Sequence, residues 1–439
     1  MLFDMLYMLA ALVLSPVFIY RILVRGKYRA SFWQRWGKVP ERPATEPPAR
    51  RVWIHAVSVG EALSARTLVE MIDGERPDWD VVVSTATETG QAVARKSFGE
   101  DRVVYCPFDF SWTVRRAFDR IRPSVLVLLE LELWPNLIRE AHRRGVPVTV
   151  LNGRITERSF RGFRRFRAFF APTFARVARF AVQTEEYARR LGALGVAADR
   201  IAVTGSVKYD AVRTGLDDGA AAEARAELGI ADGERVILAG STHPGEDEAL
   251  LGAYAALKED SGPLALVLVP RHPEQYDRVA AAVTGRGLEL VRKTELGAGA
   301  ERPEGAVVLV DTMGELGRLY AAADVVFVGG SLIEHGGQNV MEPAGLGKPC
   351  VFGPHMWNFQ DAVDALLAGG AAGAARQVAS ADELAGAVGA LLSDANAASE
   401  MGEAARRCIE ERKGATRRNF EVLTGALEKI AGSSASRPG

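Results

Sequence analysis

Short apolar runs rich in valine and isoleucine recur along the first half of the chain, with amphipathic stretches between them. The runs lie at 52–55, 81–84, 103–105, 125–129, 147–151, 180–183 and 201–204. Most are continuous rather than alternating, a pattern typical of strands buried on both faces of a parallel sheet. Because such strands alternate with helical stretches, the pattern predicts a doubly wound α/β domain.

The second half repeats this organisation after a change of composition. Residues 211–234 are rich in Ala, Asp, Glu and Gly, and a second series of apolar runs follows: RVILAGS, LALVLVP, LELV, AVVLVD, ADVVFVGGS and KPCVFG. Each half opens with a strand, a serine turn and a Gly-Glu pair, seen as HAVSVGE and AGSTHPGEDE. We therefore predict two Rossmann-like domains facing a cleft, with ligands beyond the carboxyl ends of the strands.

The length and composition agree with this division. The chain has 439 residues, of which 48% are hydrophobic and 25% charged, as in globular proteins with sizeable cores. We place an N-terminal domain at 30–212 and a C-terminal domain at 213–405. A C-terminal helix at 406–430 and a tail at 431–439 follow.

The first twenty residues are almost entirely apolar, about the length of a bilayer-spanning helix, although they include Asp4 and Pro16. No basic stretch precedes them and no A-x-A site follows, which argues against a cleaved signal peptide. Basic residues come directly afterwards: Arg21, Arg25, Lys27, Arg29 and Arg35. By the positive-inside rule we expect 1–22 to be an inner-membrane anchor, with the remainder on the cytoplasmic face. Whether it spans the bilayer or lies in its surface stays open, and a buried core helix is the alternative.

Charge and motif searches exclude several function classes. The net charge of −1 gives no general signal for nucleic acid. The three cysteines and six histidines lack metal-ligand spacing, so no metal or cofactor is expected. Neither a G-x-S-x-G nucleophile elbow nor a phosphate-binding P-loop is present.

The stretch VWIHAVSVGEALSA poses a question about one carboxylate. Ser58 and Glu61 fit a capping box around Gly60, in which the serine caps the following helix and the glutamate reaches back. Glu61 also lies beyond a strand's carboxyl end. It is therefore a helix cap, a catalytic carboxylate or both.

Other charged residues follow strands in the N-terminal half. Glu130 and Glu132 end a buried strand, where carboxylates are costly unless they are paired or solvated in a cleft. Lys208 follows a strand near the domain boundary and could reach a leaving phosphate. Arg154 is a further cleft candidate. For these residues, ordinary surface charge is the alternative.

The richest stretch of the C-terminal half is 329–360. Gly336 and Gly337 would form a phosphate-facing turn with Gln338 and Asn339, and Glu342 could accept hydrogen bonds from a ribose diol. Two more strand ends carry candidates, since Arg271 can hold a phosphate and the turn at 311–315 could line a base pocket. Further cleft candidates are Ser241 and His272.

Arginine and phenylalanine are interleaved over 152–180, mostly at helical spacing. A basic helix with an aromatic face suits an anionic membrane surface, although nucleic acid needs the same ingredients and buried Phe with solvated Arg is the plain alternative. Because an anchor is predicted in the same chain, we favour lipid. The candidates for contact with a lipid, either as a bound acceptor molecule or as the membrane surface, are Arg161, Arg164, Arg165 and Phe166.

Taken together, these motifs resemble the 3-deoxy-D-manno-octulosonic acid (Kdo) transferases of lipopolysaccharide synthesis. The motifs that carry the resemblance run in family order over nearly the whole chain: HAVSVGE, ELELWPN, GSVKYD, GSTHPGE, VPRHPE, DTMGEL, FVGGSL, GGQNVMEP and GPHMWNF. Leu131 departs from the family, which usually has a small polar residue between the two glutamates.

The resemblance implies an inverting GT-B glycosyltransferase that moves Kdo from CMP-Kdo to the tetraacyl lipid A precursor without a metal. Its partners would include anionic inner-membrane lipids and no nucleic acid. Glu61 maps to the family's proposed general base, and Glu130 and Lys208 to its transition-state stabilisers. The CMP contacts map to Pro270, Arg271, Met313, Gly314, Glu315, Asn339, Val340, Met341 and Glu342.

Two other functions remain open at this point. One is a GT-B enzyme that uses a UDP-sugar, as in lipid A disaccharide or peptidoglycan synthesis. The other is a membrane-bound nucleotide-binding or scaffold protein without catalysis. The number of Kdo residues transferred and the oligomeric state are also left open.

Overall fold

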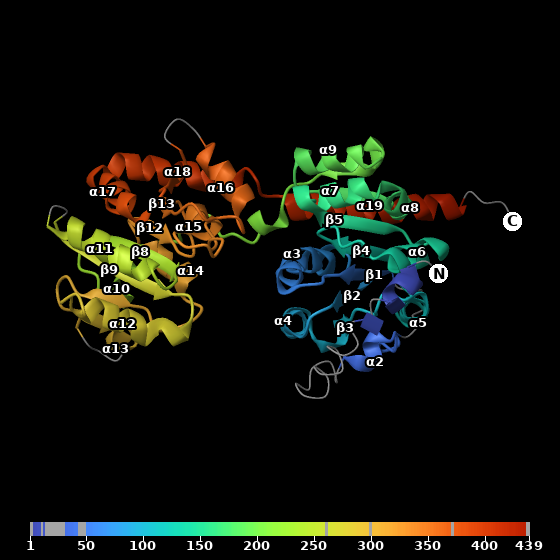
Figure 1. The fold of residues 1–439 in the computed structure, drawn as a ribbon, viewed down its shortest axis with the longest axis horizontal. Helices are drawn as coiled ribbons and strands as arrows, with labels where there is room; N and C mark the ends of the chain where they lie inside the picture. The colour runs from blue at the N-terminus through green and yellow to red at the C-terminus, as the bar shows by residue number, and fades with distance from the viewer. Residues whose placement is uncertain are drawn as a thin grey trace. The chain divides into compact units, whose positions relative to one another are not determined.

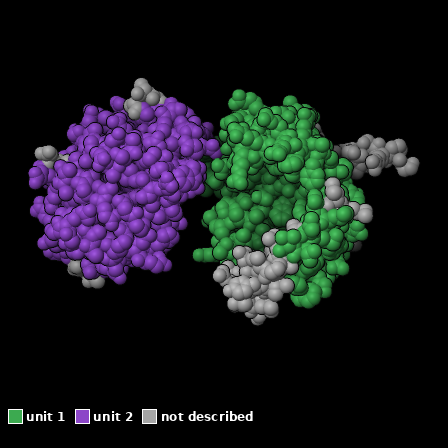
Figure 2. Space-filling model, viewed as in Figure 1, with its two compact units in different colours: residues 1–211, 413–439 green, residues 212–412 purple. Residues whose placement is uncertain are grey.

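The computed structural model describes residues 3–9, 12–13, 31–42, 50–259, 262–297, 301–369 and 373–435, with side chains as far as residue 428. The chain divides into two compact units (Figure 2). Unit 1 holds residues 1–211 and 413–439, and unit 2 holds residues 212–412.

Unit 1 is built on a parallel sheet of seven strands in the order β3-β2-β1-β4-β5-β6-β7 (Figure 1). The strands are β1 (Arg50–His55), β2 (Trp79–Thr85), β3 (Val103–Tyr105), β4 (Val125–Leu129), β5 (Val148–Gly153), β6 (Arg179–Val182) and β7 (Ile201–Val203). The helices are α2 (Phe32–Arg35), α3 (Val59–Glu75), α4 (Glu88–Phe98), α5 (Ser111–Ile121), α6 (Pro135–Arg143), α7 (Glu157–Arg165), α8 (Arg167–Arg176), α9 (Glu185–Ala193) and α19 (Ala415–Ala435).

The apolar runs of the first half all coincide with these strands, so the predicted parallel α/β domain is confirmed. Continuous runs occur because helices cover both faces of the sheet and leave β1 and β4 almost wholly buried. β1 and β4 are neighbours although β2 and β3 come between them in sequence. Their carboxyl ends therefore flank the topological switch point, where open α/β sheets bind ligands.

The last helix returns to unit 1 and packs on α3, β5 and β6. Asp210 accepts hydrogen bonds from the backbone N–H groups of Gly414, at 2.6 Å, and Thr416. The Asn419 carboxamide joins two strand ends, because its Oδ1 accepts from Asn152 N at 2.9 Å and its Nδ2 donates to Thr204 Oγ1 at 3.1 Å. Long-range polar contacts therefore fix α19 to unit 1.

Unit 2 repeats the architecture, with a parallel seven-stranded sheet in the order β10-β11-β9-β8-β12-β13-β14. Its strands are β8 (Arg235–Thr242), β9 (Leu264–Pro270), β10 (Leu290–Arg292), β11 (Val307–Leu309), β12 (Val325–Val328), β13 (Cys350–Phe352) and β14 (Arg376–Gln377). Its helices are α10 (Ala220–Glu227), α11 (Glu246–Lys258), α12 (Tyr276–Thr284), α13 (Lys293–Gly297), α14 (Leu316–Leu319), α15 (Met341–Gly345), α16 (Gln360–Leu367), α17 (Leu384–Ser393) and α18 (Ala395–Glu410). β8 and β12 flank its switch point.

Only part of the predicted anchor at 1–22 is described, since residues 1–2, 10–11 and 14–30 lie outside the described residues. Residues 3–9 are helical, and their polar side chains point inward. Asp4 is buried and accepts hydrogen bonds from Ser111 N at 2.7 Å and Asn136 Nδ2 at 3.2 Å. The Tyr7 hydroxyl donates to Asp109 Oδ2 at 3.0 Å. In the described part of the chain, no helix has both the length and the apolar character needed to cross a bilayer.

Candidate functional site

Glu61 lies in the first turn of α3, just beyond the carboxyl end of β1, and is 5% exposed. Ser58 caps the helix by accepting from Glu61 N at 3.3 Å, as the capping box predicts. The carboxylate accepts from the Ser58 hydroxyl at 2.9 Å and from the N–H of Val57, one residue before the cap, at 2.8 Å. Gly60 between them is exposed and packs against nothing closely. The residues of the box therefore orient Glu61, and among the described residues it has no cationic partner.

Burial, helped by the charges of Glu132 and Glu130, raises the pKa of Glu61 to about 7, although the hydrogen bonds from Val57 and Ser58 oppose the shift. Burial and the charge of Glu130 also raise the pKa of Glu132. The charge of Glu130 therefore acts on both Glu61 and Glu132, because a nearby like charge disfavours the ionised form of a carboxyl group. A carboxylate with a pKa near 7 is matched to general-base chemistry at neutral pH.

The turn after β4 has an unusual backbone. Glu130 and Leu131 have φ of 54° and 72°, in the left-handed region that favours glycine. Glu130 N donates to Leu151 O at 3.2 Å and Glu132 N to Leu129 O at 3.2 Å, so hydrogen bonds hold the turn. Strain of this kind persists where surrounding structure over-determines it and is common at functional sites. Here it turns two carboxylates out at the edge of the sheet.

Lys208 lies on the short 3-10 helix η3 (Val207–Tyr209), which packs against α3, the helix of Glu61. Val207 N donates to Asn152 Oδ1 at 3.2 Å, and Asp210 is tied to the start of α19 as described above. Within the ranges that the structure describes, the Lys208 ammonium forms no ion pair or hydrogen bond. An anchored backbone thus presents a half-buried cation that is available for an anion.

Arg154 follows β5 at the same sheet edge, since Leu151 pairs with Leu129 ahead of Glu130. Its side chain is half-buried, and its Nε is buried without a hydrogen-bond partner among the described residues. A guanidinium in this position suits an anionic group. Its predicted role stays a prediction.

In unit 2, Asn339 and Glu342 form one polar unit at the start of α15. Asn339 Nδ2 donates to Glu342 Oε1 at 2.9 Å, and Asn339 Oδ1 accepts from Met341 N at 3.1 Å. Glu342 is exposed, whereas Val340 and Met341 between them are buried. The Asn339 carboxamide therefore orients the Glu342 carboxylate, whose Oε2 accepts no hydrogen bond from the described residues.

The other predicted donor contacts also follow strands of unit 2. Pro270 ends β9, and Arg271 and His272 beyond it are exposed. Arg271 N donates to Thr242 O at 3.1 Å, which ties this turn to the end of β8, next to Ser241.

Glu315 is the N-cap residue of α14, accepts a hydrogen bond from the Thr312 hydroxyl and pairs with Lys293 at 3.0 Å. The Thr312 hydrogen bond and the Lys293 charge lower its pKa. Met313 is 58% exposed, and Gly314 beside it has open space on its surface side. This turn therefore presents an apolar side chain and backbone, while its carboxylate is already neutralised.

Gly336 and Gly337 are buried, with φ of 101° and 78°. A Cβ on Gly336 would lie 2.4 Å from Asn358 Nδ2, and one on Gly337 2.2 Å from Met356 Sδ. Only glycine fits, because the turn packs against the 356–358 segment. The predicted phosphate-facing role stays a prediction, and α15, with five residues, is too short to supply a strong N-terminal dipole.

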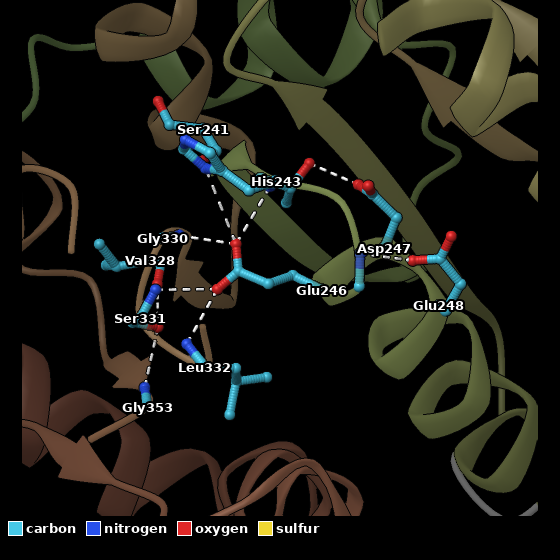
Figure 3. Close-up of polar contacts among 12 residues, drawn as sticks. Ser241, His243, Glu246, Asp247, Glu248, Val328, Gly330, Ser331, Leu332 and Gly353 are labelled. Atoms are coloured by element: carbon cyan, nitrogen blue, oxygen red, sulfur yellow. Dashed lines mark hydrogen bonds and ion pairs between the residues drawn. The ribbon is translucent and has the colours of Figure 1, made fainter. Parts of the chain in front are cut away.

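Sequence reasoning missed two buried residues after β8. Glu246 is fully buried and bonds to the turn after β12 (Figure 3). His243 Nδ1 donates to Ser241 O at 3.1 Å, and its Nε2 is buried without a partner among the described residues. The echo between HAVSVGE and AGSTHPGEDE was the available signal, since it aligns Glu246 with Glu61.

The Arg/Phe stretch forms two helices rather than one. α7 and α8 meet at Phe166, which is 56% exposed, while Phe163 and Phe170 pack against the core and Phe174 belongs to it. Exposed cations lie along α7: Arg161, Arg164 and Arg165. Phenylalanines packed against or within the core and solvated arginines therefore describe most of the stretch, and the predicted membrane residues are the part left exposed.

Comparison with known proteins identifies the family. A family model described as 3-deoxy-D-manno-octulosonic-acid transferase (kdotransferase) matches residues 30–211. The 3-deoxy-D-manno-octulosonic acid transferase of Bordetella pertussis is 34% identical over 437 residues, covering 95% of this chain and 98% of the relative. That of Haemophilus influenzae is 31% identical over 405 residues, covering 92% and 93%. The chain belongs to the Kdo transferase family.

The Kdo transferase assignment makes this protein a glycosyltransferase, as predicted. Solved structures agree on the fold. A glycosyltransferase from Rickettsia africae has a TM-score of 0.56 at 11% identity, covering 86% of this chain and 98% of that one. UDP-GlcNAc 2-epimerase from Neisseria meningitidis has a TM-score of 0.55 at 13% identity, covering 86% and 100%. The predicted GT-B fold of two Rossmann-like domains is thereby confirmed.

Proposed function

We propose that this Kdo transferase moves Kdo from CMP-Kdo to the tetraacyl lipid A precursor, lipid IVA, with inversion at the anomeric carbon. The observation that carries the proposal is Glu61, a buried carboxylate at a topological switch point whose pKa is raised to about 7. The membership of this protein in the Kdo transferase family supports Kdo as the transferred sugar.

The reaction is a single displacement. An acceptor hydroxyl oxygen attacks the anomeric carbon, its proton passes to the Glu61 carboxylate, and the bond from that carbon to the CMP phosphate oxygen breaks. Glu61 suits this role because it is oriented by Ser58 and Val57 and no cation of the described part of the chain neutralises it. Lys208 stabilises the charge that develops in the transition state, and Glu130 acts with it.

The donor is assigned to unit 2. Glu342, oriented by Asn339, receives the ribose hydroxyls, Arg271 receives the phosphate, and the exposed Met313 lies against the base. Each of these groups follows a strand at its carboxyl end, where open sheets bind ligands. No metal is assigned to any step.

The test is turnover by the purified full chain. It is incubated with lipid IVA and either CMP-Kdo or UDP-sugars, with and without EDTA, and the products are weighed by mass spectrometry. We expect Kdo-bearing lipid from CMP-Kdo alone, unchanged by EDTA. Transfer from a UDP-sugar, or CMP binding without transfer, would replace this proposal by one of the two alternatives. The same spectra count the Kdo residues added.

Glu342→Ala is expected to weaken CMP binding by about 10–100-fold, because hydrogen bonds to a charged group contribute about 1.5–3 kcal/mol. Isothermal titration with CMP measures the effect. Glu334→Ala is the control, since Glu334 is an exposed carboxylate on the same loop. Equal affinities for the Glu342 and Glu334 variants would remove Glu342 from the donor site.

We also propose that the enzyme works at the cytoplasmic face of the bacterial inner membrane, held partly by anionic lipids. The helical residues 3–9 keep Asp4 inward and leave apolar side chains exposed: Met5 at 62%, Leu6 at 46%, Met8 at 49% and Leu9 at 61%. Phe3 packs on Phe169 of α8, with ring centroids 4.6 Å apart, and α8 directly follows the exposed Phe166 and the arginines of α7 along the chain. Apolar side chains beside cations favour an anionic lipid surface.

Met5→Glu combined with Leu9→Glu is expected to lower binding to phosphatidylglycerol vesicles at least tenfold. Removing two apolar side chains from the lipid phase weakens the free energy of membrane binding by about 2 kcal/mol or more. Co-sedimentation measures this, with Leu367→Glu, an exposed leucine of unit 2, as the control. Undiminished vesicle binding by the double variant would exclude this surface.

A further inference from the structure

One buried carboxylate of unit 2 has no part in the proposed chemistry. Glu246 is the first residue of α11 and is fully buried. Its two oxygens accept four backbone hydrogen bonds (Figure 3). Oε2 accepts from Gly330 N at 2.6 Å and His243 N at 3.1 Å, and Oε1 from Ser331 N at 2.8 Å and Leu332 N at 3.0 Å.

These contacts join the two strands at the switch point. Glu246 follows β8, and the three consecutive donors from Gly330 to Leu332 follow its neighbour β12. The same segment forms the base of the loop 329–340, which we call the donor loop because it leads to the proposed nucleotide contacts. Gly337 N donates to Gly330 O at 2.7 Å, and Gln338 N donates to Gly329 O at 3.0 Å. The loop then continues directly into the Asn339–Glu342 pair.

A second set of bonds extends this support to β13. The Ser331 hydroxyl donates to Val328 O at 2.6 Å and accepts from Gly353 N at 2.9 Å. The segment held by Glu246 is thus bonded to the chain on both sides. A shift of the Ser331 backbone would therefore disturb the chain at both Val328 and Gly353.

Only an ionised carboxylate satisfies this arrangement, because each oxygen receives two N–H donors. A carboxamide in its place would direct its own N–H₂ at two N–H groups and leave them unsatisfied. Glu61, at the corresponding position of unit 1, accepts one N–H and one hydroxyl, so a carboxamide fits there. The two glutamates share a place in the topology and differ in their partners.

We infer that Glu246 is a positioning residue for donor binding: it holds the loop after β12 so that Asn339 and Glu342 meet the nucleotide. This inference rests on the proposed function, in which CMP-Kdo is the donor. Glu246 itself does not touch the donor.

The test compares Glu246→Gln with Asp247→Asn in the full chain. Asp247 is the adjacent carboxylate and is equally buried, but it bonds to Thr242 Oγ1 and Arg278 instead of the donor loop. Both variants remove one buried negative charge, so their losses of thermal stability control for folding. CMP affinity is measured by titration well below either melting temperature, and hydrogen exchange reports the 330–342 amides.

We expect Glu246→Gln to weaken CMP binding at least tenfold and to speed exchange over 330–342, while Asp247→Asn changes both less than twofold. CMP affinity of Glu246→Gln within twofold of wild type, or an equal loss in Asp247→Asn, would overturn the inference. If wild type does not bind CMP, the proposed donor fails, and unchanged loop exchange in Glu246→Gln would then overturn the inference separately. Should Glu246→Gln not fold, Ser331→Ala replaces it, with an expected loss of at least threefold and unchanged affinity as the contradicting result.

Discussion

Glu61→Gln is expected to lower the transfer rate by about 10³-fold while the protein folds normally, since a positioned general base contributes about 10²–10⁴-fold. Glutamine keeps the cap, because its Oε1 can accept from Val57 N and its N–H₂ can donate to Ser58 Oγ. It cannot accept the acceptor's proton. Single-turnover transfer from CMP-Kdo measures the effect. A variant that keeps more than about a tenth of the activity would reduce Glu61 to a helix cap.

The pH dependence supplies a second readout for Glu61. The carboxylate is the active form, so we expect the wild-type rate to rise with pH through about 7 and then level off. The folded-state pKa lies above the unfolded value, so the native state holds the proton more tightly and stability falls as pH rises from about 4.5 to about 7.

Glu61→Gln should therefore raise the free energy of unfolding at pH 8, by at most about 3 kcal/mol, and change it little near pH 4. Denaturant unfolding at the two pH values measures the difference. Equal effects at both values would mean that Glu61 titrates normally.

Lys208→Met is expected to lower kcat by about 10²–10³-fold, the cost of removing one group that stabilises transition-state charge. The reason is that its ammonium has no ion pair in the described structure and sits on η3 beside α3, where the backbone is anchored by Asn152 and α19. Steady-state kinetics with saturating CMP-Kdo measure the loss.

Lys96→Met is the matched control, because Lys96 is an exposed lysine of α4 in the same unit. Lys208→Arg should restore only part of the rate, since a planar guanidinium does not reproduce a compact ammonium. Near-wild-type turnover in Lys208→Met would show that Lys208 does not stabilise the leaving phosphate.

The fold was readable from the sequence because its signals are local. The strands of unit 1 follow from continuous apolar runs, and Ser58 capping Glu61 N follows from residues three apart. The exception is β14, where Arg376 and Gln377 are both exposed, so no apolar run marks the strand. The sequence also predicted one helix where α7 and α8 are separated at Phe166. The helical spacing of Phe continues through this position, so no local signal marks the break.

By itself, the sequence determined the two parallel α/β units, the family, and the carboxylates and cations that follow the strands. The tertiary structure decided what those groups experience. Burial, together with Glu130 and Glu132, raises the pKa of Glu61, against the opposite effect of its hydrogen bonds from Val57 and Ser58. Strand order places β12 beside β8 and so gives Glu246 three of its four partners, about 85 residues away. Capping and strand propensity are local and therefore legible in sequence, whereas desolvation and hydrogen bonds across a sheet exist only once the chain has folded.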